Sequence, residues 1–313
     1  VAQALQHFGC DYLAVAFVNE GVEIRQAGIK LPILVLDPMV SALHHMFNNQ
    51  LEPEVCSFDF LDILIEEVRR HGLKHYPIHI KLDTGMHRLG FVEDDIDLLG
   101  RALHHDHTLR IATIFSHLSS ADMPEEDKFT EGQIERFDYM SAQLIEWLDY
   151  TPLRHIANSA AIIRFPYAAF EMCRLGLGLY GYGFEHNDAL IPVATLSTRI
   201  VQIKSLAKGE SVGYGRSAKL DSERVIATIP VGYADGWSVR VKGQNAPIVG
   251  RVCMDSAMID ITGIEGVEVG DKVTIFSAEK GNTLEDMAKV LDTITYEIMT
   301  SISSRVKRIY TER

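Results

Sequence analysis

The sequence has few cysteines, no cluster of basic residues and no long apolar run. Its four cysteines stand far apart and form no Cys-x-x-Cys pair, so neither a disulfide framework nor a zinc ribbon is indicated. Lys and Arg number 30 against 43 Asp and Glu, a formal net charge of -13, which argues against nucleic acid as a partner. No apolar run approaches the ~20 residues that cross a bilayer. We therefore expect a cytoplasmic protein with no membrane segment.

What the sequence does have is enough apolar material for a large core. Hydrophobic residues make up 47% of its 313 positions, which suits two domains or one large barrel with an appendage. Residues 1–9 have the pattern of the last turns of an amphipathic helix that stops at Gly9, with no N-cap before it. This pattern predicts that the sequence begins inside a structural element.

The first part of the chain alternates short apolar runs with segments of helical period, as in βα units around a parallel sheet. The predicted helices include residues 60–71 and 128–148. The predicted strands are residues 12–18, 33–36, 54–58, 78–82, 111–117, 155–157 and 173–180. A closed barrel of this type has eight strands. We expect residues 1–184 to form a TIM-type (β/α)8 barrel that lacks its first βα unit.

The residue pattern of the chain changes after residue 183, where runs of β-branched residues alternate with glycine turns. Only residues 283–291 have a clear helical pattern there. The predicted strands are residues 195–203, 225–230, 257–261 and 272–276. We expect a mostly β C-terminal domain over residues 188–313, joined through a linker at residues 185–187.

Polar side chains gather where the predicted barrel strands end, which is where active sites form in this type of barrel. Lys81 and His117 close their strands, Asn158 and Ser159 follow another, and Arg174 lies in the last one. Taken singly, each has a structural interpretation: a solvated charge, a structural histidine, or a helix cap at Asn158 rather than a phosphate site. Their concentration at one rim favours a functional site.

Six motifs occur in both halves of the chain. They are Lys-Leu-Asp-Thr-Gly-Met-His-Arg at 81–88, His-Ile-Ala-Asn-Ser at 155–159, Arg-Leu-Gly-Leu-Gly-Leu-Tyr-Gly at 174–181, Gly-Tyr-Gly at 213–215, Pro-Val-Gly-Tyr-Ala-Asp-Gly at 230–236 and Gly-Arg-Val-Cys-Met-Asp at 250–255. With these motifs in that family's order and at compatible spacing, the sequence is similar to alanine racemases from Val1 to Arg313.

The resemblance implies a pyridoxal 5'-phosphate enzyme that interconverts L- and D-alanine for peptidoglycan precursors. Arg174 resembles the arginine that faces the pyridine nitrogen of the cofactor, and a guanidinium leaves that nitrogen unprotonated. Related barrel decarboxylases have a carboxylate there, so Arg174 argues against decarboxylation. Tyr214 resembles a catalytic base that reaches the neighbouring subunit's site and bonds a histidine matching His117, which contacts Arg174.

The remaining site residues are also assigned by resemblance. The substrate-binding positions are Arg88, Met254 and Tyr233, and Lys81 matches a lysine that is often carbamylated. The positions that match cofactor contacts are Arg174, His117, Asn158, Ser159, Gly176, Leu177 and Tyr296. The positions that match an outer gate are Asp122 and Arg251, with Val239, next to Arg240, at a gate position that is often arginine.

One departure from the family concerns the lysine that holds the cofactor. That lysine lies in a Lys-Ala-x-x-Tyr-Gly segment at the end of the family's first strand, and the 313 residues contain no such segment. Lys30, Lys74 and Lys128 have surface patterns, and Lys81 matches a different position. We therefore expect the lysine outside these residues, and the 313 residues to be inactive by themselves.

The expected assembly is a head-to-tail homodimer that shares its sites across subunits, and a fusion to a cell-wall ligase domain fits the family. Two alternatives stay open: a broader amino-acid racemase that accepts serine, and a non-catalytic domain that binds the cofactor. Metal binding has only loose histidines in its favour. They are His71, His75, His104, His105 and His107, which we interpret as surface residues because no carboxylate pattern accompanies them.

Overall fold

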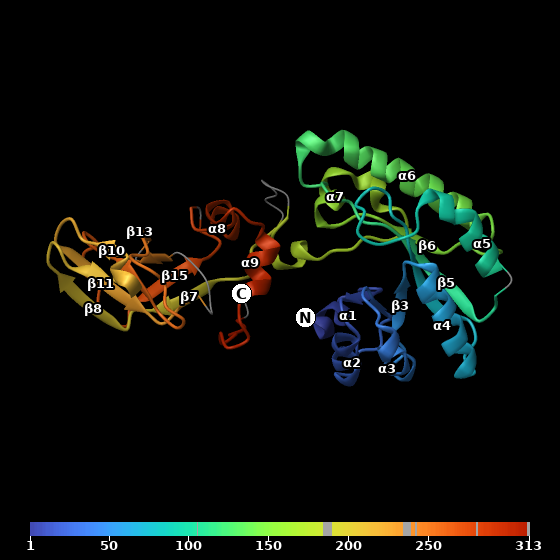
Figure 1. Cartoon of the computed structure of the whole chain (residues 1–313), viewed down its shortest axis with the longest axis horizontal. Helices are drawn as coiled ribbons and strands as arrows, with labels where there is room; N and C mark the ends of the chain where they lie inside the picture. The colour runs from blue at the N-terminus through green and yellow to red at the C-terminus, as the bar shows by residue number, and fades with distance from the viewer. Residues whose placement is uncertain (105, 184–189, 234–238, 242, 280, 312–313) are drawn as a thin grey trace. The chain divides into compact units, whose positions relative to one another are not determined.

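The computed structural model describes residues 1–104, 106–183, 190–233, 239–241, 243–279 and 281–311 (Figure 1). The chain divides into two compact units. Val1–Gly176 belongs to the first unit, and Leu177–Tyr182 belongs to the second with the C-terminal part of the chain. The predicted linker and both predicted domain limits, at 184 and 188, lie outside the described residues. Within the described residues, no helix is both long enough and apolar enough to cross a membrane.

The first unit is a curled sheet of six parallel strands in chain order, with helices around its outside (Figure 1). Its strands are β1 (Leu13–Val15), β2 (Ile33–Val35), β3 (Glu52–Val55), β4 (Tyr76–Lys81), β5 (Leu109–Phe115) and β6 (Leu153–His155). Its α-helices are α1 (Ala2–His7), α2 (Val18–Gln26), α3 (Leu43–Asn48), α4 (Phe58–Arg70), α5 (Ile96–His104), α6 (Asp127–Ile145) and α7 (Ser159–Arg164). The predicted class, a parallel barrel-type sheet followed by a mostly β domain, is confirmed.

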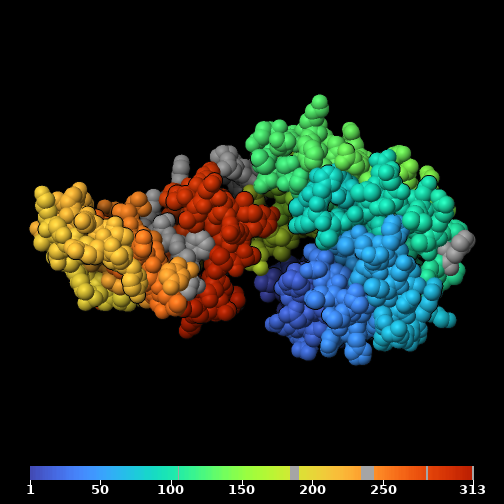
Figure 2. Space-filling view, in the orientation of Figure 1, coloured from blue at the N-terminus to red at the C-terminus, as the bar shows by residue number. Residues whose placement is uncertain are grey.

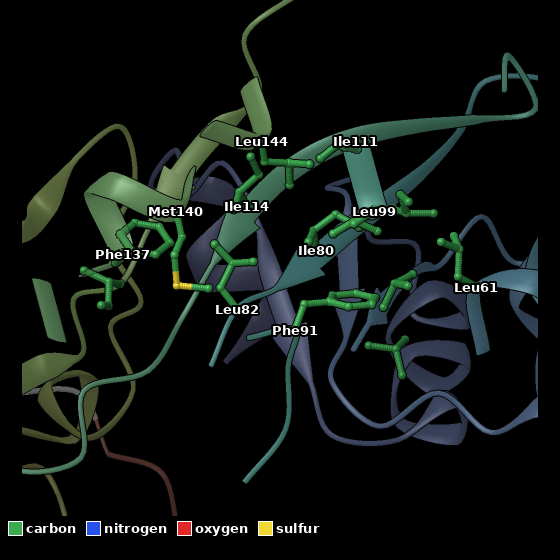
Figure 3. Close-up of a cluster of buried hydrophobic side chains, with 14 of the residues drawn as sticks. Leu61, Ile80, Leu82, Phe91, Leu99, Ile111, Ile114, Phe137, Met140 and Leu144 are labelled. Carbon is green, nitrogen blue, oxygen red and sulfur yellow. The ribbon is translucent and has the colours of Figure 1, made fainter. Parts of the chain in front are cut away.

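The apolar stripes of the helices explain how they pack on the sheet. In α4, Leu61, Leu64 and Val68 are fully buried at helical spacing, and the Ser57 hydroxyl caps the helix by accepting from the Phe60 amide at 3.3 Å. The helices α4, α5 and α6 bring such side chains onto Ile80, Ile111 and Ile114 of the sheet (Figure 3). Burying each side chain of this size stabilises the fold by ~1.5–3 kcal/mol.

The other face of the same strands is polar, although it is also buried. Because side chains alternate along a strand and paired residues of parallel strands share a face, the register Glu54↔His79 places these two together, opposite Val55 and Ile80. The buried polar residues of β3 to β6 are Glu52, Glu54, His79, Lys81, Thr113 and His155. Figure 2 shows the blue-to-green side chains of the first unit packed against one another in a continuous surface.

The predicted seventh strand, residues 173–180, is wrong. In this stretch the backbone amide of Arg174 donates to the Ala157 carbonyl at 3.0 Å, and the chain then enters a 3-10 turn, η5 (Leu177–Tyr180). Glycines at 176 and 178, two residues apart, provide no side chain for one face of a strand at these positions and weaken extended structure. A tight turn therefore replaces the strand.

The second unit consists of small antiparallel sheets. Its strands are β7 (Leu196–Arg199), β8 (Gln202–Leu206), β9 (Ser211–Val212), β10 (Ala218–Lys219), β11 (Arg224–Ile229), β12 (Val239–Val241), β13 (Gln244–Ala246), β14 (Ala257–Asp260) and β15 (Lys272–Phe276), with helices α8 (Leu284–Leu291) and α9 (Thr295–Ser301). The run predicted as one strand at 195–203 is two strands, because the chain leaves β15 and joins β11 after Arg199.

Candidate active site

The candidate site lies at the end of the parallel strands where the predicted polar residues gather. Lys81 is the last residue of β4, His117 follows β5, and Asn158 follows β6. Arg174 is held at the same rim by the hydrogen bond that its backbone amide donates to the Ala157 carbonyl. The structure therefore brings together four of the predicted site residues that come from separate segments of the first unit.

The Arg174 guanidinium is held by a dense set of acceptors. Its Nη1 lies 2.6 Å from Nδ1 of His155 and donates to the His155 carbonyl at 3.3 Å. Its Nη2 donates to the carbonyls of Ser116, at 2.7 Å, and Ile156, at 3.2 Å, and lies 3.2 Å from Nδ1 of His117. Burial lowers the pKa of Arg174 to about 10, so the group stays charged at neutral pH.

These contacts determine which ring nitrogen carries the proton in both histidines. A guanidinium can only donate, so Nδ1 of each ring accepts and the proton of each neutral ring is on Nε2. Burial and the Arg174 charge lower the pKa of His117 to about 3. The same two causes lower the pKa of His155 well below its ordinary value. Both rings are therefore neutral, and each has an Nε2–H to donate.

From His155 a chain of hydrogen bonds runs across the polar face of the sheet. Its Nε2 donates to Oγ1 of Thr113 at 2.9 Å, and the Thr113 hydroxyl lies 2.7 Å from Nδ1 of His79. The Nε2 of His79 lies 2.9 Å from Oε2 of Glu52, which also accepts from the hydroxyl of Tyr12 at 3.3 Å. The donors and acceptors from His155 to Glu52 are matched when each bond in this row donates in the direction from Arg174 towards Glu52.

Lys81 and Glu54 are two buried titratable groups of opposite charge near this row of hydrogen bonds. Lys81 is 6% exposed, and its Nζ lies 4.3 Å from the centre of the Phe115 ring. Glu54 is 3% exposed, and among the described residues its buried Oε1 has no hydrogen-bond partner. Burial raises the pKa of Glu54, and the charges of Lys81 and of the exposed Arg88 oppose that rise. Burial lowers the pKa of Lys81; the Glu54 charge opposes that change, whereas the Arg88 charge adds to it.

The segment after β6 joins a helix start to the Arg174 loop. The Oδ1 of Asn158 accepts from the Ala161 amide at 3.0 Å, so the structure confirms Asn158 as the cap of α7. The Ser159 hydroxyl accepts from the amide of Gly176 at 3.1 Å. Apart from Gly176 and its two chain neighbours, no atom of the described residues lies within 4 Å of the place where a Cβ on Gly176 would stand. This leaves open space beside the loop.

In the second unit, Tyr214 begins a short turn, η6 (Tyr214–Arg216), between the paired strands β9 and β10. A Cβ on Gly213 would lie 2.8 Å from the amide nitrogen of Arg251, and the Arg251 amide donates to Oγ of Ser217 at 2.9 Å. The predicted base and the predicted gate residue Arg251 are therefore neighbours. Tyr214 is 69% exposed.

Tyr233 and Met254 are also brought together. The Tyr233 amide donates to the Cys253 carbonyl at 2.9 Å, and a Cβ on Gly232 would lie 2.1 Å from the Met254 carbonyl oxygen. Only glycine permits this approach. The side chains of Tyr233 and Met254 are 64% and 55% exposed, and Tyr296 on α9 is 46% exposed.

The other predicted positions have simpler surroundings. Leu177 is buried in the core of the second unit, and Asp122 is exposed in the loop after β5. The side chains of Val239 and Arg240, and the whole of His105, lie outside the described residues. Among the described residues, no three potential metal ligands gather at one point.

The sequence interpretation missed the two buried glutamates and Thr113. Glu54 was placed at the start of a predicted strand over 54–58, whereas β3 is Glu52–Val55. The missed signal is that charged residues recur with period two in adjacent strands, at Glu52 and Glu54 and again at His79 and Lys81. Such spacing points to one polar face.

Two family models cover nearly the whole chain. The model described as "Alanine racemase, N-terminal domain" matches residues 1–183, and that described as "Alanine racemase, C-terminal domain" matches residues 193–310. Two similar relatives are alanine racemase 1 of Clostridium acetobutylicum, 39% identical over 99% of this chain and 84% of the relative, and alanine racemase 2 of Caldanaerobacter subterraneus subsp. tengcongensis, 41% identical over 100% of this chain and 84% of the relative.

Solved structures give the same result. The alanine racemase of Clostridium difficile 630 has a TM-score of 0.88 at 33% identity, over 99% of this chain and 84% of the other. The alanine racemase of Streptomyces lavendulae, a D-cycloserine producer, has a TM-score of 0.92 at 31% identity, over 100% of this chain and 86% of the other.

Proposed function

The chain belongs to the alanine racemase family, whose members are pyridoxal-phosphate-dependent isomerases, and from this premise we propose that its site interconverts L- and D-alanine. The observation that carries the proposal is the Arg174 guanidinium, held by two neutral histidines and three carbonyls. A fixed cation of this kind suits a cofactor nitrogen that must stay unprotonated.

The residues at the rim fit the cofactor. Its phosphate and phenolic oxygen are anionic, and the rim provides the cations Lys81, Arg88 and Arg174 with the Ser159 hydroxyl and the open space at Gly176. When bound, the cofactor withdraws electrons from the substrate's α-carbon and makes its proton acidic. Asn158, Ser159, Gly176, Leu177 and Tyr296 are the proposed contacts of the phosphate group.

Arg174 has one donor left for the ring nitrogen. Its Nη groups bond the histidines and carbonyls, and among the described residues no acceptor lies within hydrogen-bond distance of its Nε. We assign this Nε–H to the ring nitrogen. Because a guanidinium does not release its proton there, electron withdrawal stays moderate, which favours return of the α-proton over side reactions.

Tyr214 is the proposed base for one face of the α-carbon. With Nδ1 of His117 occupied by Arg174, the Nε2–H of His117 is free to donate to the Tyr214 oxygen. Because Tyr214 is 69% exposed, its hydroxyl needs a covering surface before it acts as a base. We assign that role to a second subunit in a head-to-tail homodimer, where Tyr214 and Tyr233 complete the partner's site.

Substrate selection is assigned to three positions. Arg88 binds the substrate carboxylate, the backbone N–H of Met254 contacts the same group, and Tyr233 narrows the site towards a methyl side chain. Asp122 and Arg251 form the outer gate. Whether the site also takes serine is decided by assaying both amino acids.

The lysine that holds the cofactor is not assigned to any lysine of this chain. The 313 residues have no Lys-Ala-x-x-Tyr-Gly segment, and the buried lysine of the rim, Lys81, faces the Phe115 ring. The proposal is that these residues alone do not catalyse, and that catalysis needs this segment.

The test of Arg174 compares two variants in a chain that includes the lysine segment. Arg174→Glu puts an acid opposite the ring nitrogen, so racemisation falls at least 100-fold (about 2.7 kcal/mol) while transamination of alanine to pyruvate rises relative to it. Arg174→Lys keeps the charge and changes the ratio of racemisation to transamination little, although the lysine loses several of the hydrogen bonds of Arg174. An equal ratio of racemisation to transamination in both variants would show that Arg174 does not face the ring nitrogen.

The test of the shared site mixes two inactive variants, Tyr214→Phe and Arg174→Glu. If each site uses Tyr214 from one subunit and Arg174 from the other, mixed dimers contain one intact site and recover part of the activity. No recovery after subunit exchange would place both residues in one subunit's site.

A further inference from the structure

Gln133 of α6 is a buried amide whose two ends both bond the segment after β5. It is 1% exposed. Its Nε2 donates to the His117 carbonyl at 3.2 Å, and its Oε1 accepts from the Ser119 amide at 3.0 Å and from the Ser119 hydroxyl at 3.2 Å. Because a backbone N–H only donates and a carbonyl only accepts, these partners fix the direction of the Gln133 amide. We call these three bonds the Gln133 clamp.

The clamp reproduces the bonds that a parallel strand would make. In a parallel sheet, one residue donates to a carbonyl of the next strand and accepts from the N–H two residues further along. Gln133 does the same for His117 and Ser119 with its side chain. The backbone ladder ends just before them, where the Ser116 amide donates to the His155 carbonyl at 3.2 Å. The amide of Gln133 therefore continues the support of the chain where β6 stops.

The helix that carries the clamp is itself held firmly. Phe137, Met140 and Leu144 of α6 are fully buried in the cluster beside the sheet (Figure 3). The same helix also bonds the segment after β4, because Nη1 of Arg136 donates to the Thr84 carbonyl at 2.8 Å. One rigid helix thus fixes the segments that follow two neighbouring strands.

The residue that the clamp orients is His117. Its ring Nδ1 lies 3.2 Å from Nη2 of Arg174, and its carbonyl is held by Gln133. With both the ring and the backbone held, the direction of its Nε2–H is fixed. A hydrogen bond weakens steeply as its angle departs from linear, so a small rotation of this backbone would weaken a bond from Nε2–H to Tyr214.

We propose that Gln133 is a positioning residue of the site, which holds the His117 backbone so that its Nε2–H is aimed at the Tyr214 oxygen. The inference rests on the proposed function for the role of His117 and Tyr214, whereas the clamp is a property of the chain itself. Gln133 touches neither substrate nor cofactor in this assignment and acts through His117.

Gln133→Glu keeps the shape of the side chain and makes the clamp depend on pH. A protonated carboxyl group has one donor and one acceptor and can replace both ends of the amide, whereas a carboxylate only accepts and repels the His117 carbonyl. Burial favours the protonated form. Since the pKa of His117 is lowered to about 3, its ring stays neutral above pH ~5. The charged residues that line the same surface cavity as Gln133 are Arg136, Lys128, Glu125 and Glu126.

The test measures kcat and KM for alanine in a chain that includes the lysine segment. As pH rises from about 6 to about 9, kcat of Gln133→Glu relative to the parent should fall roughly tenfold (about 1.4 kcal/mol) as the carboxyl group ionises, with KM nearly unchanged. The matched control is Gln143→Glu on the same helix, where the Gln143 amide donates to the Tyr139 hydroxyl instead of bonding the segment after β5. Its ratio to the parent should not change with pH.

A second variant, Gln133→Met, covers the case in which the glutamate form does not fold. Methionine has similar length and no N–H, so kcat should be lowered at every pH, and hydrogen exchange at the Ser119 amide should be faster than in the parent. A constant ratio in folded Gln133→Glu, or the parent's kcat in folded Gln133→Met, would overturn the inference. An inactive parent chain with faster Ser119 exchange in Gln133→Met would refute the proposed function and leave the clamp standing.

Discussion

The hydroxyl of Thr113 links the Arg174 support to Glu52, and Thr113→Val removes this hydroxyl with little change of shape. Thr113 is fully buried. Its Oγ1 accepts from Nε2 of His155 at 2.9 Å and lies 2.7 Å from Nδ1 of His79. Valine leaves both ring nitrogens buried without a partner at these positions.

The expected loss follows from the two orphaned nitrogens. Each buried polar atom left without its hydrogen bond costs ~1–3 kcal/mol, and the relief of burying a methyl instead of a hydroxyl offsets part of it. The free energy of unfolding should therefore fall by about 2–4 kcal/mol. The His155 ring also loses the bond that fixes its Nε2, so the bonds of Arg174 to this ring should weaken.

Urea unfolding of the parent and of two variants measures this loss. The control is Thr130→Val in α6, because the Thr130 hydroxyl is equally buried but has no hydrogen-bond partner among the described residues. Removing it should leave stability unchanged or raise it by up to ~1 kcal/mol. The reasoning fails if Thr113→Val is no less stable than Thr130→Val.

Three further predictions concern local packing and pH. Asn158→Ala should cost about 1 kcal/mol by removing the cap of α7, whereas Asn158→Asp should keep most of it; urea midpoints that agree within error would contradict the cap. Gly100→Ala should destabilise by ~1–3 kcal/mol because its Cβ would lie 2.2 Å from Cδ1 of Trp147, whereas Gly132→Ala, with nothing within 4 Å, should stabilise by ~0.5–1 kcal/mol; thermal midpoints that move together would refute this. Because the pKa of His117 is lowered to about 3 in the folded state, the unfolded chain binds its proton first as pH falls below ~6.5, and stability declines towards pH 3. His117→Asn should flatten that decline, and an unchanged slope of unfolding free energy against pH would remove His117 as a cause.

The sequence predicted most of the first unit because its strands are short apolar runs between turns and its helices have a clear period. The exception, residues 173–180, has the apolar composition of a strand. Glycine at 176, 178 and 181 allows a turn instead, and at Gly181 a Cβ would meet the Ile191 carbonyl oxygen at 2.0 Å. Such a close approach depends on tertiary packing, which periodicity does not report.

The rim of the site was predictable because Lys81, His117 and Arg174 stand at strand ends. The buried layer beneath it was not, because a glutamate inside a strand looks locally like a break in an apolar run. Only the register of β3 against β4 shows that Glu54 shares a face with His79 and Lys81. The support of Arg174 by His155 likewise depends on the pairing of β5 with β6, which brings Phe115 beside His155.

The central assignment is tested by measuring the cofactor's absorbance and alanine racemisation on two chains. One is residues 1–313, and the other has the family's Lys-Ala-x-x-Tyr-Gly segment with its strand and helix joined before Val1. The account predicts that the lysine-bound cofactor band and the interconversion of L- and D-alanine are present in the second chain and absent from the first. A cofactor band with activity in residues 1–313 would mean that one of their own lysines holds the cofactor, and would contradict the assignment of Lys81 and of the rim around Arg174.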